Sequence, residues 1–299
     1  MAYHKPVLLI ESIEGLNIKP KGIYIDLTFG GGGHSREVLR QLGNKGSLIV
    51  FDQDADAREN IPEDKRLTFI MANFRYLKNF LRYHDIAQVD GILADLGISS
   101  HQIDKPERGF SFKTNSELDM RMSSLSDTTA TKVLNDYDES DLTRIFKNYG
   151  EISNASRISK TIVEARKSEP VSTTNDLERA LGNLIPKHNS SKFLAKLYQA
   201  LRIEVNQELE ALEEMLLQTQ DALVPGGRLV VITYHSLEDR LVKNYMKSGN
   251  LQGDVEKDFY GKLLVPWKLI NKNVIVPTEE ELARNKRARS AKLRIAEKL

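Results

Sequence analysis

The strongest constraint on the fold is an alternation of short β-rich runs with helical patterns in the first third of the chain. The β-rich runs fall at residues 22–27, 47–51, 67–71 and 89–94, and a helical pattern from about residue 34 to 42 separates the first two. Strands that alternate with helices are typical of βα units around a parallel sheet. The sequence therefore predicts an α/β fold in which each strand delivers a polar loop at its carboxyl end.

The pattern changes between about residues 108 and 202, where helical periodicity replaces strand character. Apolar residues recur there at three- and four-residue intervals and mark one buried helix face: Ile152, Ala155, Ile158, Ile162 and Ala165. Helices are also expected at 141–148 and 174–184, where start and stop signals occur. We predict an inserted helical domain at 108–202 within an α/β domain formed by residues 1–107 and 203–299.

The α/β pattern resumes after the insertion. An amphipathic helix from about Leu209 is expected to end at 224–227, where proline and glycines interrupt it. A buried strand at 228–233 and a helix at 237–247 follow. Segments 265–276 and 291–299 are expected to form a final antiparallel pair, so that residues from both ends of the sequence close the sheet.

Composition excludes several classes of protein. The 299 residues include no cysteine, so disulfides, thiolate zinc sites and cysteine nucleophiles are excluded. The six histidines are scattered without a zinc-ligand spacing, and we predict no metal site. No apolar run has the length of a membrane span, and the first residues lack the apolar stretch of a signal peptide. We expect a cytoplasmic protein with no membrane partner.

The formal net charge of +1 hides a basic C-terminal segment. This segment contains one acid, Glu297, and these cations: Arg284, Lys286, Arg287, Arg289, Lys292, Arg294 and Lys298. Such a segment can lie along a phosphate backbone, because each neutralised phosphate releases counterions. The alternative is a solvated tail.

A run of glycines, Gly30–Gly33, joins the first predicted strand to the following helix. Consecutive glycines let backbone N–H groups approach a ligand, and the helix N-terminus offers an anion about 0.3–1 kcal/mol. A tight strand–helix turn needs glycine anyway, so this run alone is equally consistent with a structural role. Asp52, at the end of the second strand, adds a carboxylate that can accept both hydroxyls of a ribose. Its alternative is a solvated loop carboxylate, as Asp54 or Asp56 could be. The pairing of loop and acid predicts a nucleoside cofactor.

The same loop narrows the choice of nucleoside. A dinucleotide site prefers a third glycine in the first helical turn, where this chain has Ser35, and a P-loop needs a lysine that is missing here. An S-adenosylmethionine site needs an anion cradle, an acid for the ribose and an apolar wall for adenine. Phe74, just beyond the third strand, can supply that wall. Its alternative is an aromatic core residue at the start of a helix.

Two further polar segments are expected at the same edge. Asp95 ends the fourth strand beside the switch in strand order, where it can meet the methyl donor or the acceptor, or alternatively cap the next turn. After the fifth strand, Tyr234 could stack on a base at about 1–3 kcal/mol, and His235 could order a phosphate or a proton path. Ser236 is expected to be the N-cap of the next helix.

Longer blocks of sequence carry a resemblance to a known family. In order along the chain they are 26–35, 95–102, 108–112, 118–122, 234–240 and 287–294. They resemble the RsmH/MraW family of bacterial 16S ribosomal RNA (cytosine-N4)-methyltransferases. The resemblance implies a class I S-adenosylmethionine-dependent methyltransferase, Rossmann-like with a mostly parallel sheet and an inserted helical domain. It also implies methylation of the exocyclic N4 amine of a decoding-centre cytosine, with 16S ribosomal RNA in the small ribosomal subunit or its precursor as partner.

The resemblance also assigns individual residues. It places cofactor contacts on Gly32, Gly33, His34, Asp52, Phe74, Asp95 and Gln102. Asp95 is in addition a candidate catalytic residue, with Tyr234 and His235 on the substrate side. The chain departs from the family at Leu27-Thr28, where relatives often have a smaller residue before the Thr, and at Tyr234, where many have Phe. Neither departure removes a group that the chemistry requires.

The implied reaction needs a hydrogen-bond acceptor at the amine. The lone pair of the cytosine amine is delocalised into the ring, so the site has to align the nitrogen with the sulfonium methyl and accept one N–H hydrogen bond. Asp95 or a nearby backbone carbonyl is expected to accept it. The helical insertion and the basic segment, with Arg287 and Arg289, are expected to hold the RNA.

Two other functions remain open from the sequence. One is a nucleotide-responsive RNA-binding protein without transferase activity, and the other is a methyltransferase that acts on another RNA, DNA or protein amine. The sequence does not choose between naked RNA and an assembled subunit as substrate, or between a monomer and a homodimer.

Overall fold

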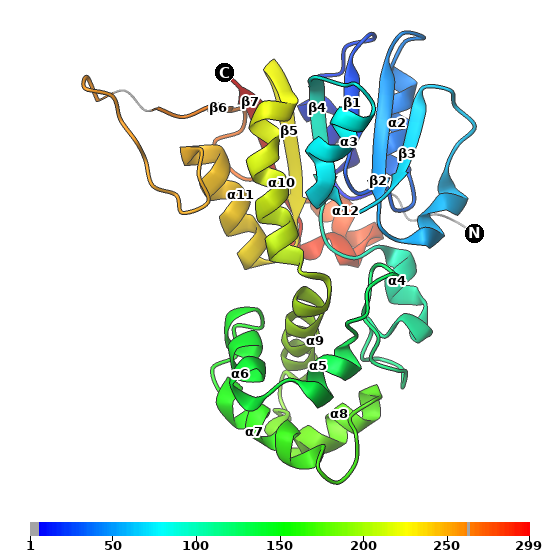
Figure 1. Ribbon diagram of the computed structural model, residues 1–299, viewed down its shortest axis with the longest axis vertical. Coiled ribbons are helices and arrows are strands. Elements are labelled where there is room, and N and C mark those ends of the chain that lie inside the picture. The colour runs from blue at the N-terminus through cyan, green and yellow to red at the C-terminus, as the bar shows by residue number, and fades with distance from the viewer. Residues whose placement is uncertain (1–5, 262–263) are drawn as a thin grey trace. The chain divides into compact units, whose positions relative to one another are not determined.

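The computed structural model describes residues 6–261 and 264–299, which form two compact units (Figure 1). The first unit comprises the chain up to Gly97 together with Leu209–Leu299, and the second comprises Ile98–Glu208. The predicted insertion, 108–202, lies inside the second unit, which also takes in residues on both sides of it. Among the helices of the described residues, none is long and apolar enough to cross a bilayer.

The first unit is built on a seven-stranded sheet in the order β3-β2-β1-β4-β5-β7-β6. Neighbouring strands from β3 to β5 are parallel, and β7 is antiparallel to both β5 and β6. The strands are β1 (Ile23–Asp26), β2 (Ser47–Asp52), β3 (Leu67–Met71), β4 (Val89–Asp95), β5 (Leu223–Thr233), β6 (Trp267–Leu269) and β7 (Lys292–Lys298). The predicted α/β fold and the final antiparallel pair are confirmed.

Both faces of the sheet are apolar because helices cover both of them. On one face, Ile25, Phe51, Ile92 and Val231 pack against α3 (Leu77–Tyr83), α10 (Glu208–Ala222) and α11 (Ser236–Ser248). On the other face, Tyr24, Val50, Leu93 and Val230 pack against α1 (Leu9–Leu16) and α2 (Gly33–Gln41). Figure 1 shows α3 and α10 in front of the sheet. The strands are therefore held rigidly, which fixes the loops at their ends.

The start of β5 differs from the prediction. The sequence predicts a break at 224–227 before a strand from Arg228, but α10 ends at Ala222 and β5 begins directly at Leu223. The pairing with β4 then moves from Val89↔Leu223 to Gly91↔Arg228, so residues 224–227 bulge out of the ladder. Gly226 has a φ of +78°, a left-handed backbone that favours glycine. Proline and glycine thus shape a bulge here instead of separating two elements.

The basic C-terminal segment is folded, and a solvated tail is the wrong description of it. Its second half is β7, where Arg294 Nε donates to Asp239 Oδ1 at 2.7 Å and Lys292 Nζ lies 3.2 Å from Asp239 Oδ2. These two cations therefore hold α11 against β7, because Asp239 belongs to α11. The first half forms the short 3₁₀ helix η5 (Lys286–Ser290), after α12 (Glu279–Arg284). Its Ala288 is buried, whereas Arg287 and Arg289 are exposed.

The second unit is helical around its own apolar core. Leu134, Phe146, Ile158 and Ile162 are fully buried there. The predicted helix face is confirmed at Ala155, Ile158 and Ile162, whereas Ile152 is buried before the helix begins and Ala165 is half-buried. Its helices are α4 (Ser100–Asp104), α5 (Ala130–Asp136), α6 (Glu139–Asn148), α7 (Ala155–Ala165), α8 (Thr174–Leu181) and α9 (Ser190–Asn206), with the 3₁₀ turns η3 (Pro106–Arg108) and η4 (Gly182–Leu184).

Candidate functional site

Polar groups from four strands meet at the carboxyl edge of the sheet. Asp26, Asp52 and Asp95 are the last residues of β1, β2 and β4, and Tyr234 directly follows β5. The strand order reverses between β1 and β4, where ligands bind in open α/β sheets. The structure thus brings the glycine loop, Asp52, Asp95 and Tyr234 to one edge.

The glycine loop is closed on its inner side and open on the other. A Cβ atom at Gly33 would lie 2.1 Å from Pro6 Cγ, and Gly32 has a φ of +70° with the Phe29 ring 2.9 Å from a Cβ built there. A Cβ at Gly30 would meet no atom within 4 Å. The loop therefore packs tightly where it needs glycine, and it leaves the space beside Gly30 free for a ligand.

Asp52 accepts one backbone hydrogen bond from the glycine loop and one from the turn that follows β2. The Gly30 N–H donates to its Oδ2 at 2.7 Å, and the Asp54 N–H donates to its Oδ1 at 2.8 Å. Burial raises the pKa of Asp52 to about 6. Each carboxylate oxygen has a second lone pair that can accept a ribose hydroxyl. Asp54 has a different task, since its side chain accepts from Asp56 N–H and caps the 3₁₀ helix η1 (Ala55–Asn60).

A buried network that the sequence reasoning missed joins the loop to β4. Asp26 is 1% exposed, accepts from Ser35 Oγ at 2.6 Å and accepts from the Thr28 N–H at 3.1 Å. The Asp95 N–H in turn donates to Thr28 Oγ1 at 2.6 Å. Burial also raises the pKa of Asp26. The only sequence signal for this network is Asp26 at a strand end, with the hydroxyl residues Thr28 and Ser35 further along the chain.

Asp95 is held from two sides. The Tyr234 hydroxyl donates to its Oδ1 at 2.7 Å, and His34 Nδ1 lies 3.8 Å from its Oδ2. About a fifth of the side chain, 22%, remains exposed. Burial raises the pKa of Asp95 to about 6. Asp95 does not cap the next helix, because Ser99 is the N-cap of α4.

The structure gives Tyr234 and His235 local partners. Burial raises the pKa of Tyr234, so its hydroxyl stays a donor to Asp95 at neutral pH. His235 is the N-cap of α11, accepting from the Glu238 N–H at 3.4 Å, and the prediction of Ser236 at this position is wrong. Capping needs an acceptor that reaches back over the first turn, and His235 Nδ1 provides it. Base stacking by Tyr234 and a substrate role for His235 stay predictions.

Phe74 and Gln102 lie in different units. Phe74 begins η2 (Phe74–Tyr76), is partly buried and packs against the core beneath the sheet. The preceding Asn73 donates to Gln53 Oε1 at 2.9 Å, which places this turn beside the residue after Asp52. Gln102 belongs to the second unit, where its Oε1 accepts from the Ser99 N–H at 3.0 Å in a capping box. Cofactor contacts by both residues stay predictions.

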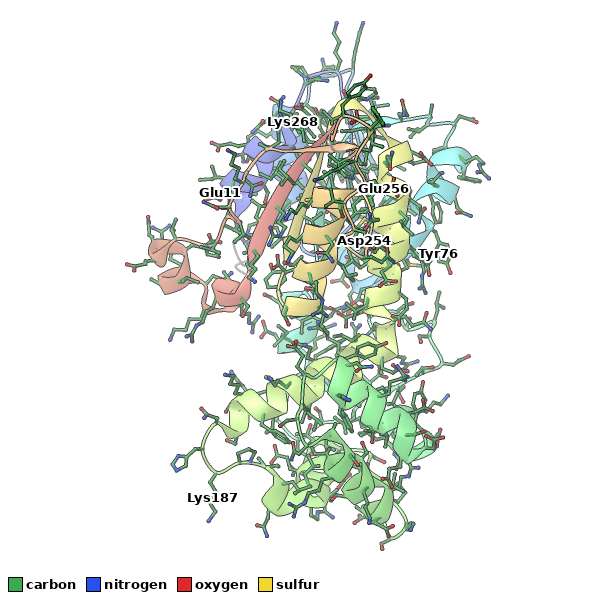
Figure 2. All side chains as sticks on the ribbon, turned by 90° about the vertical axis from the view of Figure 1, so that its left-hand side faces the viewer. Glu11, Tyr76, Lys187, Asp254, Glu256 and Lys268 are labelled. Carbon is green, nitrogen blue, oxygen red and sulfur yellow. The ribbon has the colours of Figure 1, made fainter. Side chains whose placement is uncertain are left out.

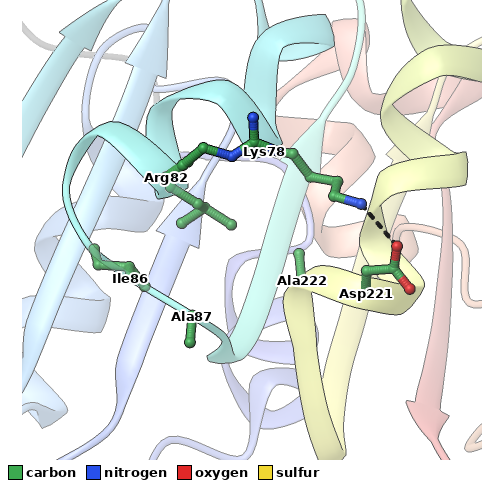
Figure 3. Close-up of a pocket in the computed structure, with 7 residues that line it drawn as sticks. Lys78, Arg82, Ile86, Ala87, Asp221 and Ala222 are labelled. Atoms are coloured by element: carbon green, nitrogen blue, oxygen red, sulfur yellow. Dashed lines mark hydrogen bonds and ion pairs between the residues drawn. The ribbon is translucent and has the colours of Figure 1, made fainter.

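A separate cavity of about 240 Å³ lies at the opposite edge of the sheet (Figure 3). It is formed between α3 and the end of α10, with Ala87 and Ala222 just before β4 and β5. Figure 3 shows the ion pair between Lys78 and Asp221 on its rim, with Nζ 2.7 Å from Oδ2. None of the polar residues gathered at the carboxyl edge lines it. We therefore assign the candidate site to the edge, where the acids and the glycine loop meet.

Comparisons with known proteins agree with the geometry. The model of the MraW methylase family matches residues 1–299. A Flavobacterium johnsoniae protein named "Ribosomal RNA small subunit methyltransferase H" is 56% identical over 299 residues, which is 100% of this chain and 99% of the relative. A Bacteroides fragilis protein of the same name is 56% identical over 296 residues, covering 99% and 97%. A solved rRNA methylase from Streptococcus thermophilus covers 97% of this chain and 93% of its own at 11% identity, with a TM-score of 0.40 on which we base no conclusion.

Proposed function

Because the chain belongs to the MraW methylase family, we propose that it methylates the exocyclic N4 amine of a decoding-centre cytosine in 16S ribosomal RNA. It is an S-adenosylmethionine-dependent methyltransferase of the class I fold, with ribosomal RNA of the small subunit as its substrate. The cytosine, its N4 atom and the decoding centre are the finer part of the proposal.

The residues at the carboxyl edge fit the cofactor. The open backbone at Gly30 and the N-terminus of α2 would receive the amino-acid part, and Asp52 would accept the ribose hydroxyls. Phe74 would provide the wall for adenine. When bound, S-adenosylmethionine supplies an electrophilic methyl group on a sulfonium.

The observation that carries the proposal is the position of Asp95. Its carboxylate lies at the edge that also holds the glycine loop and Asp52, with Oδ1 fixed by Tyr234. A fixed acceptor can bind one N–H of the amine and favour the geometry in which the nitrogen lone pair is available. Either the carboxylate of Asp95 or a nearby backbone carbonyl would accept that hydrogen bond. No strong base is required.

Charges on the first unit favour an approach of RNA from the carboxyl edge. Because Lys292 pairs with Thr233, the preceding turn η5 lies at the end of β5 near Tyr234, and it exposes Arg287 and Arg289. The connection from α11 to β6 starts at the other end of α11 and carries the acids Asp254 and Glu256, which Figure 2 labels. A stacked target base would have to leave its stack, at a cost of about a few kcal/mol, unless the RNA already presents it unpaired. RNA contacts of the helical unit stay a prediction.

Transfer of labelled methyl groups tests the proposal. The protein is incubated with labelled S-adenosylmethionine and either unmodified small subunits or deproteinised 16S RNA, and the product is digested to nucleosides. Label in N4-methylcytidine at one decoding-centre position is expected. Label in another nucleoside, or in protein, would favour the alternative methyltransferase. RNA binding without transfer would favour the RNA-binding protein. Comparison of the two substrates decides between naked RNA and the assembled particle.

The oligomeric state is open to a direct measurement. Homodimerisation, which the sequence leaves open, is tested by the mass in solution with and without RNA.

A further inference from the structure

His34 is held with one ring nitrogen fixed and the other turned toward Asp95. The ring is buried, with the residue 5% exposed. Nε2 lies 3.1 Å from the Val7 carbonyl oxygen, which can only accept, so Nε2 carries a hydrogen. Nδ1 lies 3.8 Å from Asp95 Oδ2. Nδ1 is therefore the nitrogen that can gain or lose a proton, and it points to the acid of the proposed reaction.

The groups that face this pair are acids and a phenol. Asp26 lies at the end of β1, Tyr234 follows β5, and Glu238 lies on α11, all close enough to act electrostatically on Asp95. Glu281 on α12 acts on Tyr234 and accepts from the Leu8 N–H at 2.8 Å. The acid that lies against His34 Nδ1 is Asp95, with its Oδ2 at 3.8 Å. Of the groups named here that act on Asp95, His34 is the one that can become positive.

We infer that Asp95 and His34 work as a proton-transfer pair, in which Asp95 receives the proton that the amine releases and His34 Nδ1 stores it. This inference rests on the proposed amine methylation. The amine nitrogen bonds to the methyl carbon, while the electron pair of the broken sulfur–carbon bond returns to sulfur. The electron pair of the broken N–H bond stays on nitrogen. Its proton passes to Asp95 Oδ2 and then to His34 Nδ1, and it reaches solvent after the product leaves.

The hydrogen bonds around Asp95 orient it for this transfer. Tyr234 occupies Oδ1, and this leaves Oδ2 for the amine on one side and for His34 on the other. A rotation that shortens the 3.8 Å separation by about 1 Å gives an N–H···O hydrogen bond of ordinary length. Burial raises the pKa of Asp95 to about 6, so its carboxylate can take up and release a proton near neutral pH. His34 is by this argument a positioning and proton-storing residue, because it acts through Asp95.

A purely structural role for His34 makes different predictions from a proton store. A structural ring ties α2 to Val7, and its loss would lower the rate by the same factor at every pH. A proton store adds a titration to the rate, and its loss removes that titration. The two are therefore separated by the pH dependence of the methyl-transfer step.

The first measurement uses the protein without cofactor or RNA. Nitrogen-15 NMR of labelled histidine, with His34 assigned by its absence in His34→Gln, is expected to show a hydrogen on Nε2 and none on Nδ1 in the neutral ring. A hydrogen on Nδ1 in the neutral ring would overturn the pair, because Nδ1 could then accept no proton from Asp95.

The second measurement is single-turnover methyl transfer from pH 5.5 to 8.5 at saturating cofactor. His34→Gln is expected to lower the rate about 10²-fold and to remove a step from the pH profile. The exposed His84 at the far edge provides the matched control, and His84→Gln should behave as the unchanged protein. His34→Asn is a second variant in case the first does not fold. A profile of unchanged shape would refute proton storage.

Failure of this inference is distinguishable from failure of the proposed function. If the unchanged protein transfers no methyl group to cytosine, the proposed function fails, whatever NMR shows for the pair. If transfer occurs and His34→Gln keeps the pH profile, the function stands and the proton-transfer pair is wrong.

Discussion

The acids at the carboxyl edge of the α/β unit are used in the opposite way to the capping acids of the helical unit. In the α/β unit, burial raises the pKa of Asp52 and Asp95 to about 6. In the helical unit, the hydroxyl of Thr173 and nearby backbone N–H groups lower the pKa of Asp176, which completes the capping box of α8. Backbone and hydroxyl donors likewise lower the pKa of Asp138 at the start of α6. Acids stabilise the helical unit, whereas those at the carboxyl edge cost stability and leave reactive groups in place.

The two uses have opposite pH dependence. A carboxyl whose folded pKa is raised contributes stability that is fully present below its unfolded pKa and is lost as the pH rises through about 6, as for Asp52 and Asp95. A carboxyl whose folded pKa is lowered contributes stability above its unfolded pKa, and that contribution is lost as the pH falls, as for Asp176. Substitution of Asp95 at the edge should therefore raise stability and lower activity. Substitution of the capping acid Asp176 should lower stability and leave activity unchanged.

The largest expected effect comes from Asp95→Asn. Methyl transfer should fall about 10²–10⁴-fold, while the free energy of unfolding at pH 7.5 rises by about 1–3 kcal/mol because a buried charge is removed. The gain in stability should shrink as the pH is lowered through about 6, where Asp95 itself becomes neutral. Rate assays and urea unfolding at several pH values measure both effects. A variant that loses activity and stability together would break the comparison.

Asp52→Asn should weaken cofactor binding about 10–100-fold, since hydrogen bonds to a charged group contribute about 1.5–3 kcal/mol. In the unchanged protein, affinity should decline as the pH falls through about 6, where Asp52 becomes protonated. Calorimetric titration with S-adenosylmethionine checks both. The exposed Glu59 on η1 offers a control, and Glu59→Gln should keep the affinity and its pH dependence. Equal affinity in both variants would remove Asp52 from the cofactor site.

The cations of the basic segment also divide into two groups, one inside the fold and one exposed. Arg294 is paired with Asp239 inside the fold, whereas Arg287 and Arg289 are exposed on η5. The double change Arg287→Ala and Arg289→Ala should weaken RNA binding about tenfold at low salt and reduce the salt slope by about 1–2, with cofactor affinity unchanged. RNA binding at several salt concentrations measures the slope. Lys21→Ala with Lys45→Ala, both exposed at the amino edge, is the matched control, and an equal slope in both double variants would contradict the assignment.

The smallest effect is expected in the helical unit. Asp176→Ala should lower the free energy of unfolding by about 1 kcal/mol through loss of the capping box, with the transfer rate at saturating substrates unchanged. The loss should shrink as the pH falls, since protonated Asp176 no longer serves as a charged acceptor. Thermal unfolding at two pH values is the measurement, with exposed Asn175→Ala as control. A drop in rate without a drop in stability would place Asp176 in the function instead.

The sequence predicted the strands and the edge where the acids meet, because strand periodicity and the residue at a strand end are local properties. It did not predict that residues 224–227 bulge within β5, since proline and glycine have the same local signal in a bulge and in a break. The role of His235 as N-cap was also missed, because histidine is not among the residues favoured there. The contacts among Asp26, Ser35 and Asp95 depend on how three elements pack, which no local pattern contains.

The basic segment also shows that local sequence patterns do not reveal distant partners. A run of cations predicts exposure, but Arg294 lies on a strand between two others and is paired with Asp239. The partner is far away in the sequence, so the charge run alone could not reveal it. Gln102 was expected at the cofactor, and its place in the second unit was equally hidden from local patterns.

The helical unit interrupts the sheet in the sequence, and this affects the order in which the two units can fold during synthesis. β4 leaves the ribosome before the whole of Ile98–Glu208, whereas its neighbour β5 follows after it. The helical unit, whose core is its own, can thus fold while the sheet still lacks β5, β6 and β7. Asp95 and Tyr234 meet across this gap in the chain, so the hydrogen bond that fixes Asp95 Oδ1 forms only after the whole helical unit and β5 have been made.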